Sequence, residues 1–190
     1  MSFNLPLRTY NLGMSQEEHK SHAPVSVACY VLSVSDSRTE ETDAGGRMIR
    51  ELLEGAGHTV VGHAIVKDDP HAVTLHVDGQ LLTPDVQVII TTGGTGITSR
   101  DGTFEAIDGL LEKRLEGFGE LFRMLSYQEI GPAAMMSRAT AGTAIRSLDV
   151  PGPARPKAIF VLPGAPDAVK LAMTKLILPE LGHVVQQLNR

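Results

Sequence analysis

The sequence lacks the features that mark secreted, membrane-spanning and nucleic-acid-binding proteins. Its single cysteine, Cys29, has no second cysteine with which to form an intramolecular disulfide. No apolar segment near the N-terminus resembles a signal peptide or a membrane span. The formal net charge of -5 at pH 7 provides no basic excess for binding a phosphate backbone. We therefore expect a cytoplasmic protein that binds neither nucleic acid nor a membrane.

Metal-ligand patterns and repeats are also missing. The seven histidines show no recognisable ligand spacing, so we expect them to be solvated side chains. Cys29 lies inside the apolar run 27–32, where a buried structural thiol is far more common than a nucleophile. The 190 residues, 42% of them hydrophobic, can bury the core of one compact domain. We expect a domain over residues 25–190, preceded by an N-terminal tail over residues 1–24, which show no sustained periodicity.

Strand-like and helical segments alternate along the domain. The run from Val25 to Val34 is almost wholly apolar, which is typical of a central strand covered on both faces. Further strands are predicted at 59–66, 86–90 and 158–162, with a short strand or hairpin and a loop in 139–156. Helices are predicted at 43–56, 70–81, 103–111, 117–125, in a short turn from Pro132, and at 168–181 with an interruption at Pro179. This alternation predicts an α/β fold: a three-layer α/β/α domain with a mostly parallel central sheet.

Two of the predicted helices carry additional signals. Thr42 and Asp43 can cap the first helix at its N-terminus, and Gly57 can close it at its C-terminus. In the helix at 117–125, one apolar face is formed by Phe118, Leu121, Phe122 and Leu125.

Polar or glycine-containing turns follow four of the predicted strands. In open parallel sheets, ligands bind outside the carboxyl ends of the strands, so we expect these turns to form a site together. They are Ser35-Asp36-Ser37-Arg38, Lys67-Asp68-Asp69, Thr91 to Asp101, and Pro163-Gly164.

The turn after the strand at 86–90 is the most distinctive of the four. It reads Thr91-Thr92-Gly93-Gly94-Thr95-Gly96 and precedes a predicted helix, a setting in which glycines and helix N-terminal N–H groups bind anions. It is not a P-loop, because no Gly-Lys-Ser or Gly-Lys-Thr follows, and its glycine spacing does not match the dinucleotide-binding fingerprint.

Two acidic residues near this turn suggest phosphoryl or nucleotidyl transfer. Asp68 and Asp101 could hold a divalent metal opposite a phosphate-binding loop, and oxygen ligands favour Mg²⁺. Spacing leaves a simpler alternative open: Asp68 or Asp69 could cap the helix that begins at Pro70, and Asp101 could cap the next helix.

Several motifs occur together and in a fixed order. They are the glycine segment 91–96 with Arg100-Asp101, and segments 35–38, 67–69, 117–120, 137–138 and 162–166. The combination resembles the MoaB/Mog family of molybdenum cofactor biosynthesis proteins from about Val25 to the C-terminus. The ending 178–183, Leu-Pro-Glu-Leu-Gly-His, is closer to the MoaB branch than to the Mog branch.

The resemblance implies a molybdopterin-binding domain that adenylylates molybdopterin. In the family, the terminal phosphate of molybdopterin attacks the α-phosphate of magnesium ATP, giving adenylylated molybdopterin and pyrophosphate. By motif position, Asp68 would place Mg²⁺ and the nucleotide phosphates, and Asp101 would orient the pterin. The resemblance also implies substrate contacts from Ser35, Asp36, Thr92, Gly93, Gly94, Thr95, Gly96, Ser137, Pro163 and Gly164.

The resemblance allows more than one oligomeric state and more than one activity. Family members form trimers or hexamers, so a homotrimer or homohexamer is expected. One alternative function is a non-catalytic paralogue that binds molybdopterin or a nucleotide. Another is the nucleotide hydrolase of competence-damage proteins, which usually carry an additional domain that this chain is too short to hold.

Overall fold

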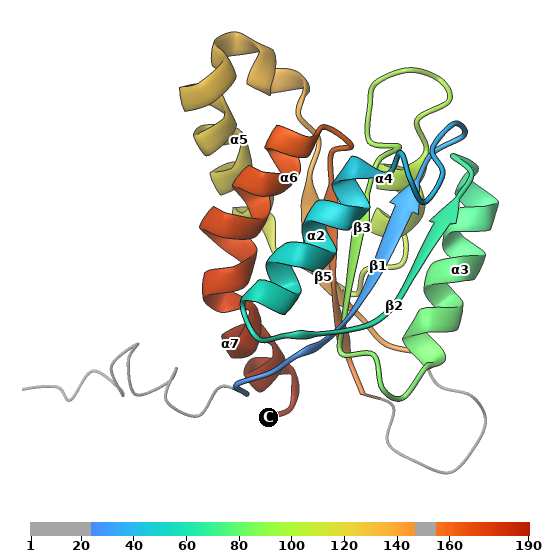
Figure 1. The fold of residues 1–190 in the computed structure, drawn as a ribbon, viewed down its shortest axis with the longest axis vertical. Coiled ribbons are helices and arrows are strands. Elements are labelled where there is room, and N and C mark those ends of the chain that lie inside the picture. Colours follow the sequence, from blue (N-terminus) through green and yellow to red (C-terminus); the bar gives the residue numbers. More distant parts are fainter. Residues whose placement is uncertain (1–23, 147–154) are drawn as a thin grey trace, which may run out of the picture.

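The computed structural model describes residues 24–146 and 155–190. A six-stranded sheet with the order β2-β1-β3-β6-β5-β4 forms its centre (Figure 1). The strands are β1 (Ala28–Val34), β2 (Thr59–Val66), β3 (Val88–Thr92), β4 (Lys113–Arg114), β5 (Thr140–Ala144) and β6 (Lys157–Leu162). The tail predicted for residues 1–24 lies, apart from Pro24, outside the described residues.

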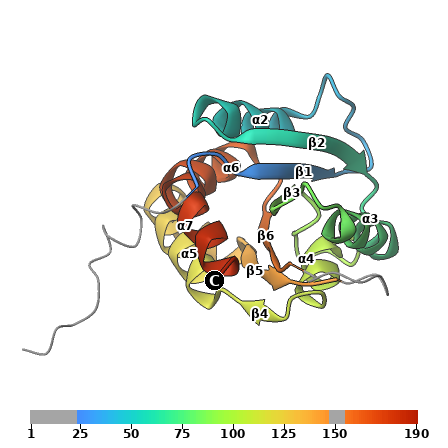
Figure 2. The ribbon, with the colours of Figure 1, turned by 90° about the horizontal axis from the view of Figure 1, so that it is seen from below.

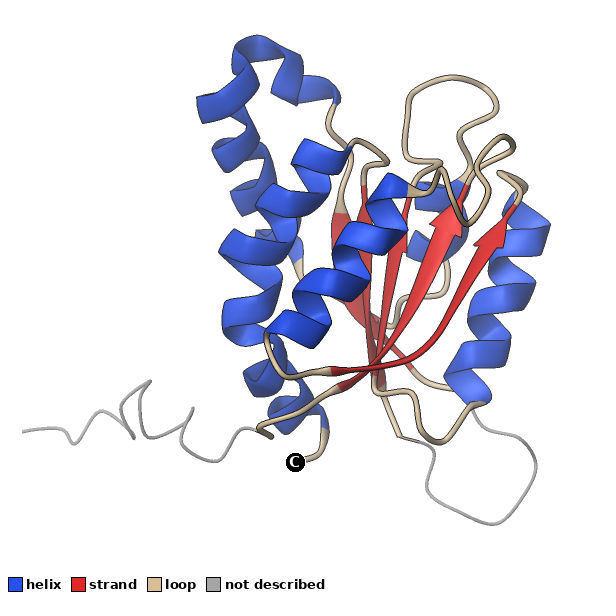
Figure 3. Ribbon diagram, in the orientation of Figure 1, coloured by secondary structure: helices blue, strands red, loops and turns tan. Residues whose placement is uncertain are grey.

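The sheet is mostly parallel, which confirms the predicted fold class. Strands β2, β1, β3 and β6 pair in parallel, while β5 pairs antiparallel with β6 and β4 antiparallel with β5. The carboxyl ends of the four parallel strands therefore meet at one edge of the sheet, as the strands and loops of Figure 3 show.

Helices cover both faces of the sheet (Figure 2). Helices α3 (Pro70–Leu82) and α4 (Thr103–Asp108) lie on one face; α2 (Ala44–Gly55), α5 (Glu116–Ile130), α6 (Pro166–Ala172) and α7 (Leu178–Leu188) lie on the other. Alternate residues of β1 point into different cores: Cys29 and Val31 pack beneath α2 and α6, and Tyr30 and Leu32 pack beneath α3. Both faces being covered explains why this strand is nearly all apolar.

Helix α2 begins and ends as the sequence predicts. The Asp43 carboxylate accepts the Gly46 N–H at 3.0 Å and caps the helix. At the other end, Gly57 has a φ of +84°, and its N–H donates to the Glu54 carbonyl at 3.0 Å. The His58 N–H donates to the Leu53 carbonyl at 2.9 Å, which completes a glycine C-cap.

The apolar face predicted for the helix at 117–125 is only partly buried. Phe118 and Phe122 pack into the core, but Leu121 is 47% exposed. The reason is geometric: Phe118 and Phe122 are one turn apart along the helix, whereas Leu121 is rotated about 100° from Phe122. Helix α5 thus turns one side to the sheet and leaves a second apolar side uncovered.

The C-terminal helical segment is not interrupted at Pro179, contrary to the prediction. Between α6 and α7 the chain makes a π-helical turn, Met173–Ile177, in which the Leu178 N–H donates to the Met173 carbonyl. Pro179 then occupies the first turn of α7, where its missing N–H matters least. The wider turn lets the helix continue to Leu188.

Smaller differences concern element ends. The strand predicted at 86–90 is β3, displaced to Val88–Thr92; α4 ends at Asp108 rather than 111; and the two-residue strand β4 was not predicted. The turn predicted from Pro132 is the 3-10 helix Gly131–Met136. The strand predicted within 139–156 is β5, and the rest of that prediction, at 147–154, lies outside the described residues.

Candidate functional site

A pocket of about 250 Å³ lies at the carboxyl ends of the four parallel strands. Its wall comes from the last residues of β1 and β3 and from the chain after β1, β2, β3 and β6, at the edge that the sequence predicted. The lining residues are Ser33, Val34, Ser35, Asp36, Arg38, Asp68, Thr92, Gly93, Gly94 and Gly164.

The glycines after β3 are required by close packing. Gly93 and Gly94 have φ values of +101° and +63°, which favour glycine. A Cβ at Gly93 would lie 2.2 Å from the Val34 carbonyl oxygen, and one at Gly94 would lie 2.1 Å from Thr103 Oγ1 and 2.6 Å from Asp68 Oδ1. The backbone at this turn therefore packs directly against the end of β1, the start of α4 and an acidic side chain.

Asp68 faces the pocket, whereas Asp69 performs the capping role. The Asp69 carboxylate accepts the Ala72 N–H at 2.8 Å and caps α3. Asp68 Oδ1 accepts a long hydrogen bond, at 3.4 Å, from Thr103 Oγ1. Burial raises the pKa of Asp68, and the nearby charges of Asp101 and Asp36 act in the same direction, against hydrogen bonds from the Gly102 N–H and Thr103.

Asp101 does not cap α4 and does not line the pocket. The N-cap of α4 is Gly102, and the Asp101 Oδ2 atom instead accepts the backbone N–H of Thr98 at 2.9 Å and its hydroxyl at 2.6 Å. These bonds, with one from the Gly96 N–H, lower the pKa of Asp101. Asp101 lies beside Gly96 on the loop between β3 and α4, close enough to influence Asp68 electrostatically.

Asp36 connects three of the loops around the pocket. Its Oδ1 atom accepts the Asp68 N–H at 3.3 Å, and its Oδ2 atom forms an ion pair with Arg100. The loops after β1, β2 and β3 are thereby held together through one carboxylate.

Other predicted site residues shape the pocket through hydrogen bonds. Ser35 Oγ accepts the backbone N–H groups of Ser37 and Arg38 at 3.3 and 3.2 Å, which forms the turn after β1. Thr92 Oγ1 donates to the Pro163 carbonyl at 2.9 Å and links the ends of β3 and β6. Of the predicted substrate-contact residues, the structure leaves four outside the pocket lining: Thr95, Gly96, Ser137 and Pro163.

Ser137 does not line this pocket. It follows the 3-10 helix Gly131–Met136, and its N–H closes that turn on the Ala134 carbonyl at 3.0 Å. Its predicted contact with substrate remains a prediction.

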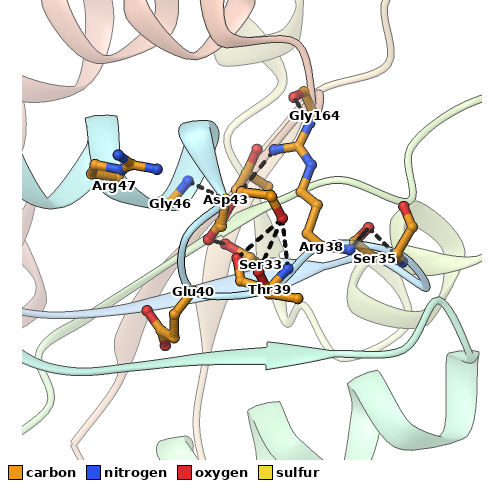
Figure 4. A network of polar contacts seen from close by, with 12 residues as sticks. Ser33, Ser35, Arg38, Thr39, Glu40, Asp43, Gly46, Arg47 and Gly164 are labelled. Atoms are coloured by element: carbon orange, nitrogen blue, oxygen red, sulfur yellow. Dashed lines mark hydrogen bonds and ion pairs between the residues drawn. The ribbon is translucent and has the colours of Figure 1, made fainter.

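A buried polar network beside the pocket links Arg38, which belongs to a turn predicted at the site, to residues that the sequence did not single out as site residues (Figure 4). Arg38 and Ser33 line the pocket and both contact Asp43. His63, expected to be solvated, instead has a side chain only 7% exposed and contacts the same carboxylate. The expectation was wrong because spacing along the chain does not show that Asp43, Ser33 and His63 meet in space. The capping position of Asp43 was the one available signal.

In the described part of the chain, a metal ion at the pocket would depend on one or two carboxylates. Within residues 24–146 and 155–190, no group of three or more His, Cys, Asp or Glu side chains is placed to hold a metal ion. Mg²⁺ is commonly bound by one or two carboxylates together with substrate phosphates, and Asp68 and Asp36 on the pocket wall fit that requirement.

None of the helices in the described residues is long and apolar enough to cross a membrane.

Comparison with known proteins places the chain in a family. The molybdenum cofactor biosynthesis protein B of Bacillus anthracis is 51% identical over 178 residues, covering 93% of this chain and 99% of the relative. A crystal structure of molybdenum cofactor biosynthesis protein B is 50% identical with a TM-score of 0.81, covering 88% of this chain and 99% of that chain. The tungsten cofactor synthesizing protein MoaB from Pyrococcus furiosus is 37% identical with a TM-score of 0.76, covering 88% and 100%.

Residues 30–183 match the family described as "Probable molybdopterin binding domain". The resemblance inferred from the motifs, including its MoaB side, is therefore confirmed. From fold, pocket and relatives together, the chain belongs to the molybdopterin-binding family of MoaB-type molybdenum cofactor biosynthesis proteins.

Proposed function

We propose that this chain acts in molybdenum cofactor biosynthesis as a molybdopterin adenylyltransferase that transfers AMP from ATP to molybdopterin. The observation that carries the proposal is the approach of Asp68 to the glycine turn: a Cβ at Gly94 would lie 2.6 Å from Asp68 Oδ1. The Asp68 carboxylate thus lies directly beside the Gly93-Gly94 backbone, which is suited to binding a phosphate group. This is the pairing that a metal-assisted nucleotidyl transfer requires.

In the proposed reaction, an oxygen of the terminal phosphate of molybdopterin attacks the α-phosphorus of ATP. A new phosphorus–oxygen bond forms, the bond between the α-phosphorus and the bridging oxygen breaks, and pyrophosphate leaves with the bonding electrons. Gly93 and Gly94 bind the phosphates through their backbone, and Asp101 orients the pterin from the loop before α4. Asp68, together with the nucleotide phosphates, would hold Mg²⁺, which would neutralise the charge that develops on those phosphates.

The size of the pocket supports binding of only a part of each proposed substrate. Its volume of about 250 Å³ is below the roughly 300–1,000 Å³ typical of a site that encloses a whole small molecule. It therefore fits phosphate groups, and the adenine and pterin rings extend beyond it. The raised pKa of Asp68 supports its role in holding Mg²⁺. Burial and the nearby charge of Asp101 disfavour the ionised carboxylate, and a bound cation would stabilise it.

The test is the release of pyrophosphate by the purified protein. With molybdopterin, ATP and Mg²⁺ together, pyrophosphate and adenylylated pterin should form in equal amounts. Release without molybdopterin would indicate a nucleotide hydrolase, and tight pterin binding with no release over many hours would indicate a binding-only paralogue. Either result would contradict the proposal.

We also propose that the protein is a homotrimer or homohexamer in which copies meet at helix α5. The C-terminal part of α5 and the following 3-10 helix expose an apolar patch formed by Leu121, Met124, Tyr127, Ile130, Met135 and Met136. These two elements extend beyond the sheet edge at the top of the view in Figure 1. Met124, Tyr127 and Met135 line one hollow in this region, and exposed apolar side chains that gather in this way are typical of a protein interface.

A further inference from the structure

We propose that Arg38 is the residue that binds a substrate phosphate in the pocket, and that Asp43 and His63 act as positioning residues for its guanidinium. Arg38 and Asp43 are not among the residues to which the motif resemblance assigned a role. The inference rests on the proposed function only for the identity of the molecule that carries the phosphate.

Arg38 is the cation of the pocket wall. The other charged side chains that line it are Asp36 and Asp68, both acidic. A phosphate entering this pocket therefore needs a positive partner on the wall in addition to any metal ion. Arginine suits this role because its planar guanidinium can donate two parallel hydrogen bonds to phosphate oxygens.

The guanidinium of Arg38 is fixed at two points. Its Nη2 atom donates to the Gly164 carbonyl at 3.0 Å, and its Nη1 atom lies 3.4 Å from Asp43 Oδ1 (Figure 4). Its remaining N–H groups have no hydrogen bond within the described part of the chain, and the side chain is 30% exposed. A long side chain held in one orientation with donors to spare binds a ligand with less loss of conformational entropy.

Asp43 is a fully buried carboxylate whose hydrogen-bonding capacity is used by four groups. Oδ1 accepts the Gly46 N–H at 3.0 Å and faces Arg38, while Oδ2 accepts the Ser33 hydroxyl at 2.5 Å and contacts His63 Nε2 at 3.1 Å. Burial acts to raise the pKa of Asp43, but the hydrogen bonds from Ser33 and Gly46 and the contacts with His63 outweigh it and lower the pKa. The carboxylate is thus ionised at neutral pH.

This sharing of the Asp43 charge explains how Arg38 can hold a ligand. The Arg38 contact is the longest of the four, so Asp43 orients the guanidinium without forming a tight bidentate pair with it. Arg38 therefore retains N–H donors, and a positive charge that is only partly neutralised, for an anion in the pocket. A tight, closed ion pair would have consumed both.

His63 contacts Oδ2 of Asp43, whereas Arg38 faces Oδ1. Its Nδ1 atom lies 3.2 Å from Glu40 Oε1, so the ring is clamped between two carboxylates. Side chains of the network pack closely against Gly46, where a larger residue would not fit: a Cβ there would lie 2.2 Å from Asp43 Oδ2 and 2.4 Å from Ser33 Oγ. The network therefore connects β2 to the pocket wall through His63, Asp43 and Arg38.

Calorimetric titration with inorganic pyrophosphate in magnesium buffer tests the role of Arg38 without requiring turnover. We expect Arg38→Met to bind pyrophosphate about 10- to 100-fold more weakly than the wild type, since hydrogen bonds to charged groups are strong. Arg38→Lys should be intermediate, because an ammonium cannot span Asp43 and Gly164 together. Arg47→Met, which removes an exposed arginine of α2 outside the pocket, is the matched control and should bind normally.

Two further titrations identify the phosphate. If Arg38→Met loses affinity for magnesium ATP, the residue binds a nucleotide phosphate; if it loses affinity for molybdopterin, the residue binds the pterin phosphate. Either result supports the inference. Wild-type protein that fails to bind pyrophosphate, or Arg38→Met that binds all three ligands as the wild type does, overturns it. Absence of adenylyl transfer with normal, Arg38-dependent pyrophosphate binding would overturn only the proposed function.

A double-mutant cycle tests whether Asp43 acts through Arg38. Asp43→Asn keeps an oxygen for the cap on α2, and His63→Gln leaves the cap untouched. Both should weaken pyrophosphate binding severalfold in the wild-type background and have no further effect in the Arg38→Met background. An equal loss in both backgrounds, or no loss from either variant, would overturn the positioning role.

Discussion

Asp68 and Asp69 are neighbours in the chain, yet their carboxylates serve different parts of the molecule. Asp69 accepts the Ala72 N–H at 2.8 Å and caps α3, whereas Asp68 lines the pocket beside Gly94. The alternative in which Asp68 serves as the helix cap is thereby excluded by the geometry. The two residues also provide a matched pair for experiment, because one substitution should affect activity and the other stability.

Substitution of the two aspartates should separate these effects. Asp68→Asn should abolish or strongly reduce magnesium-dependent adenylyl transfer while the protein stays as stable as the wild type, because no cap is lost. Asp69→Ala should lower the free energy of unfolding by about 1 kcal/mol, with the remaining folded protein active. Thermal unfolding and pyrophosphate release measured on both variants test this, and a stability loss in Asp68→Asn with normal activity would contradict the assignment.

The role of Asp101 can be tested against the hydrogen bonds that it makes. Thr98→Ala removes the hydroxyl donor at 2.6 Å but keeps the backbone donor at 2.9 Å. If Asp101 orients the pterin, Asp101→Asn should reduce transfer by orders of magnitude, and Thr98→Ala should reduce it only severalfold. Equal, small losses in the two variants would show that Asp101 only orders its own loop.

Gly94 and Gly57 both have positive φ values but differ in their surroundings. A Cβ at Gly94 would collide with Thr103 and Asp68, whereas a Cβ at Gly57 meets nothing within 4 Å. Gly57→Ala should therefore cost about 1 kcal/mol of stability from backbone strain alone and leave activity unchanged. Gly94→Ala should cost more stability and abolish pyrophosphate binding. Denaturant unfolding measures the stability of the two variants, and calorimetry measures their pyrophosphate binding. Equal losses in the two variants would contradict the close packing around Gly94.

The buried carboxylate of Asp43 should make stability depend on pH. Its folded pKa lies below the ordinary value of 3.8, so it stabilises the fold above that pH, and the contribution is lost as the pH falls through the folded pKa. We expect Asp43→Asn to be less stable than the wild type by about 1–3 kcal/mol at pH 7, with the difference shrinking below about pH 4. Urea unfolding from pH 7 to pH 3 measures this, with the exposed Glu54→Gln of α2 as control. A difference that stays constant over this range would disprove the linkage.

The apolar patch on α5 and the following 3-10 helix should decide the oligomeric state. Tyr127 and Met135 are 60% and 83% exposed in the single chain. Tyr127→Glu and Met135→Glu should convert a trimer or hexamer to smaller species, because burying an unpaired carboxylate at an interface is costly. Leu75→Glu, on the exposed side of α3, should leave the mass unchanged. Light scattering after gel filtration gives the mass of each, and variants that remain fully assembled would place the interface elsewhere.

The sequence by itself was sufficient for the fold class and for placing the candidate pocket at one edge of the sheet. Continuous apolar runs such as 28–34 identify strands covered on both faces, and capping residues such as Asp43 and glycines such as Gly57 mark helix ends by local chemistry. Because the carboxyl ends of parallel strands share an edge, the turns after four strands could be assigned to one site before any distance was known.

The tertiary structure alone decided which side chains enter the pocket and which support it. Local spacing could not choose between Asp68 and Asp69 as the cap, because the choice depends on the direction of each carboxylate. It could not show that His63 on β2 reaches Asp43, because the two are brought together only by the packing of α2 on the sheet. Nor could it show Arg38 anchored to Gly164, 126 positions away, because a contact between residues so distant in the chain exists only once β1 and β6 are aligned in the folded sheet.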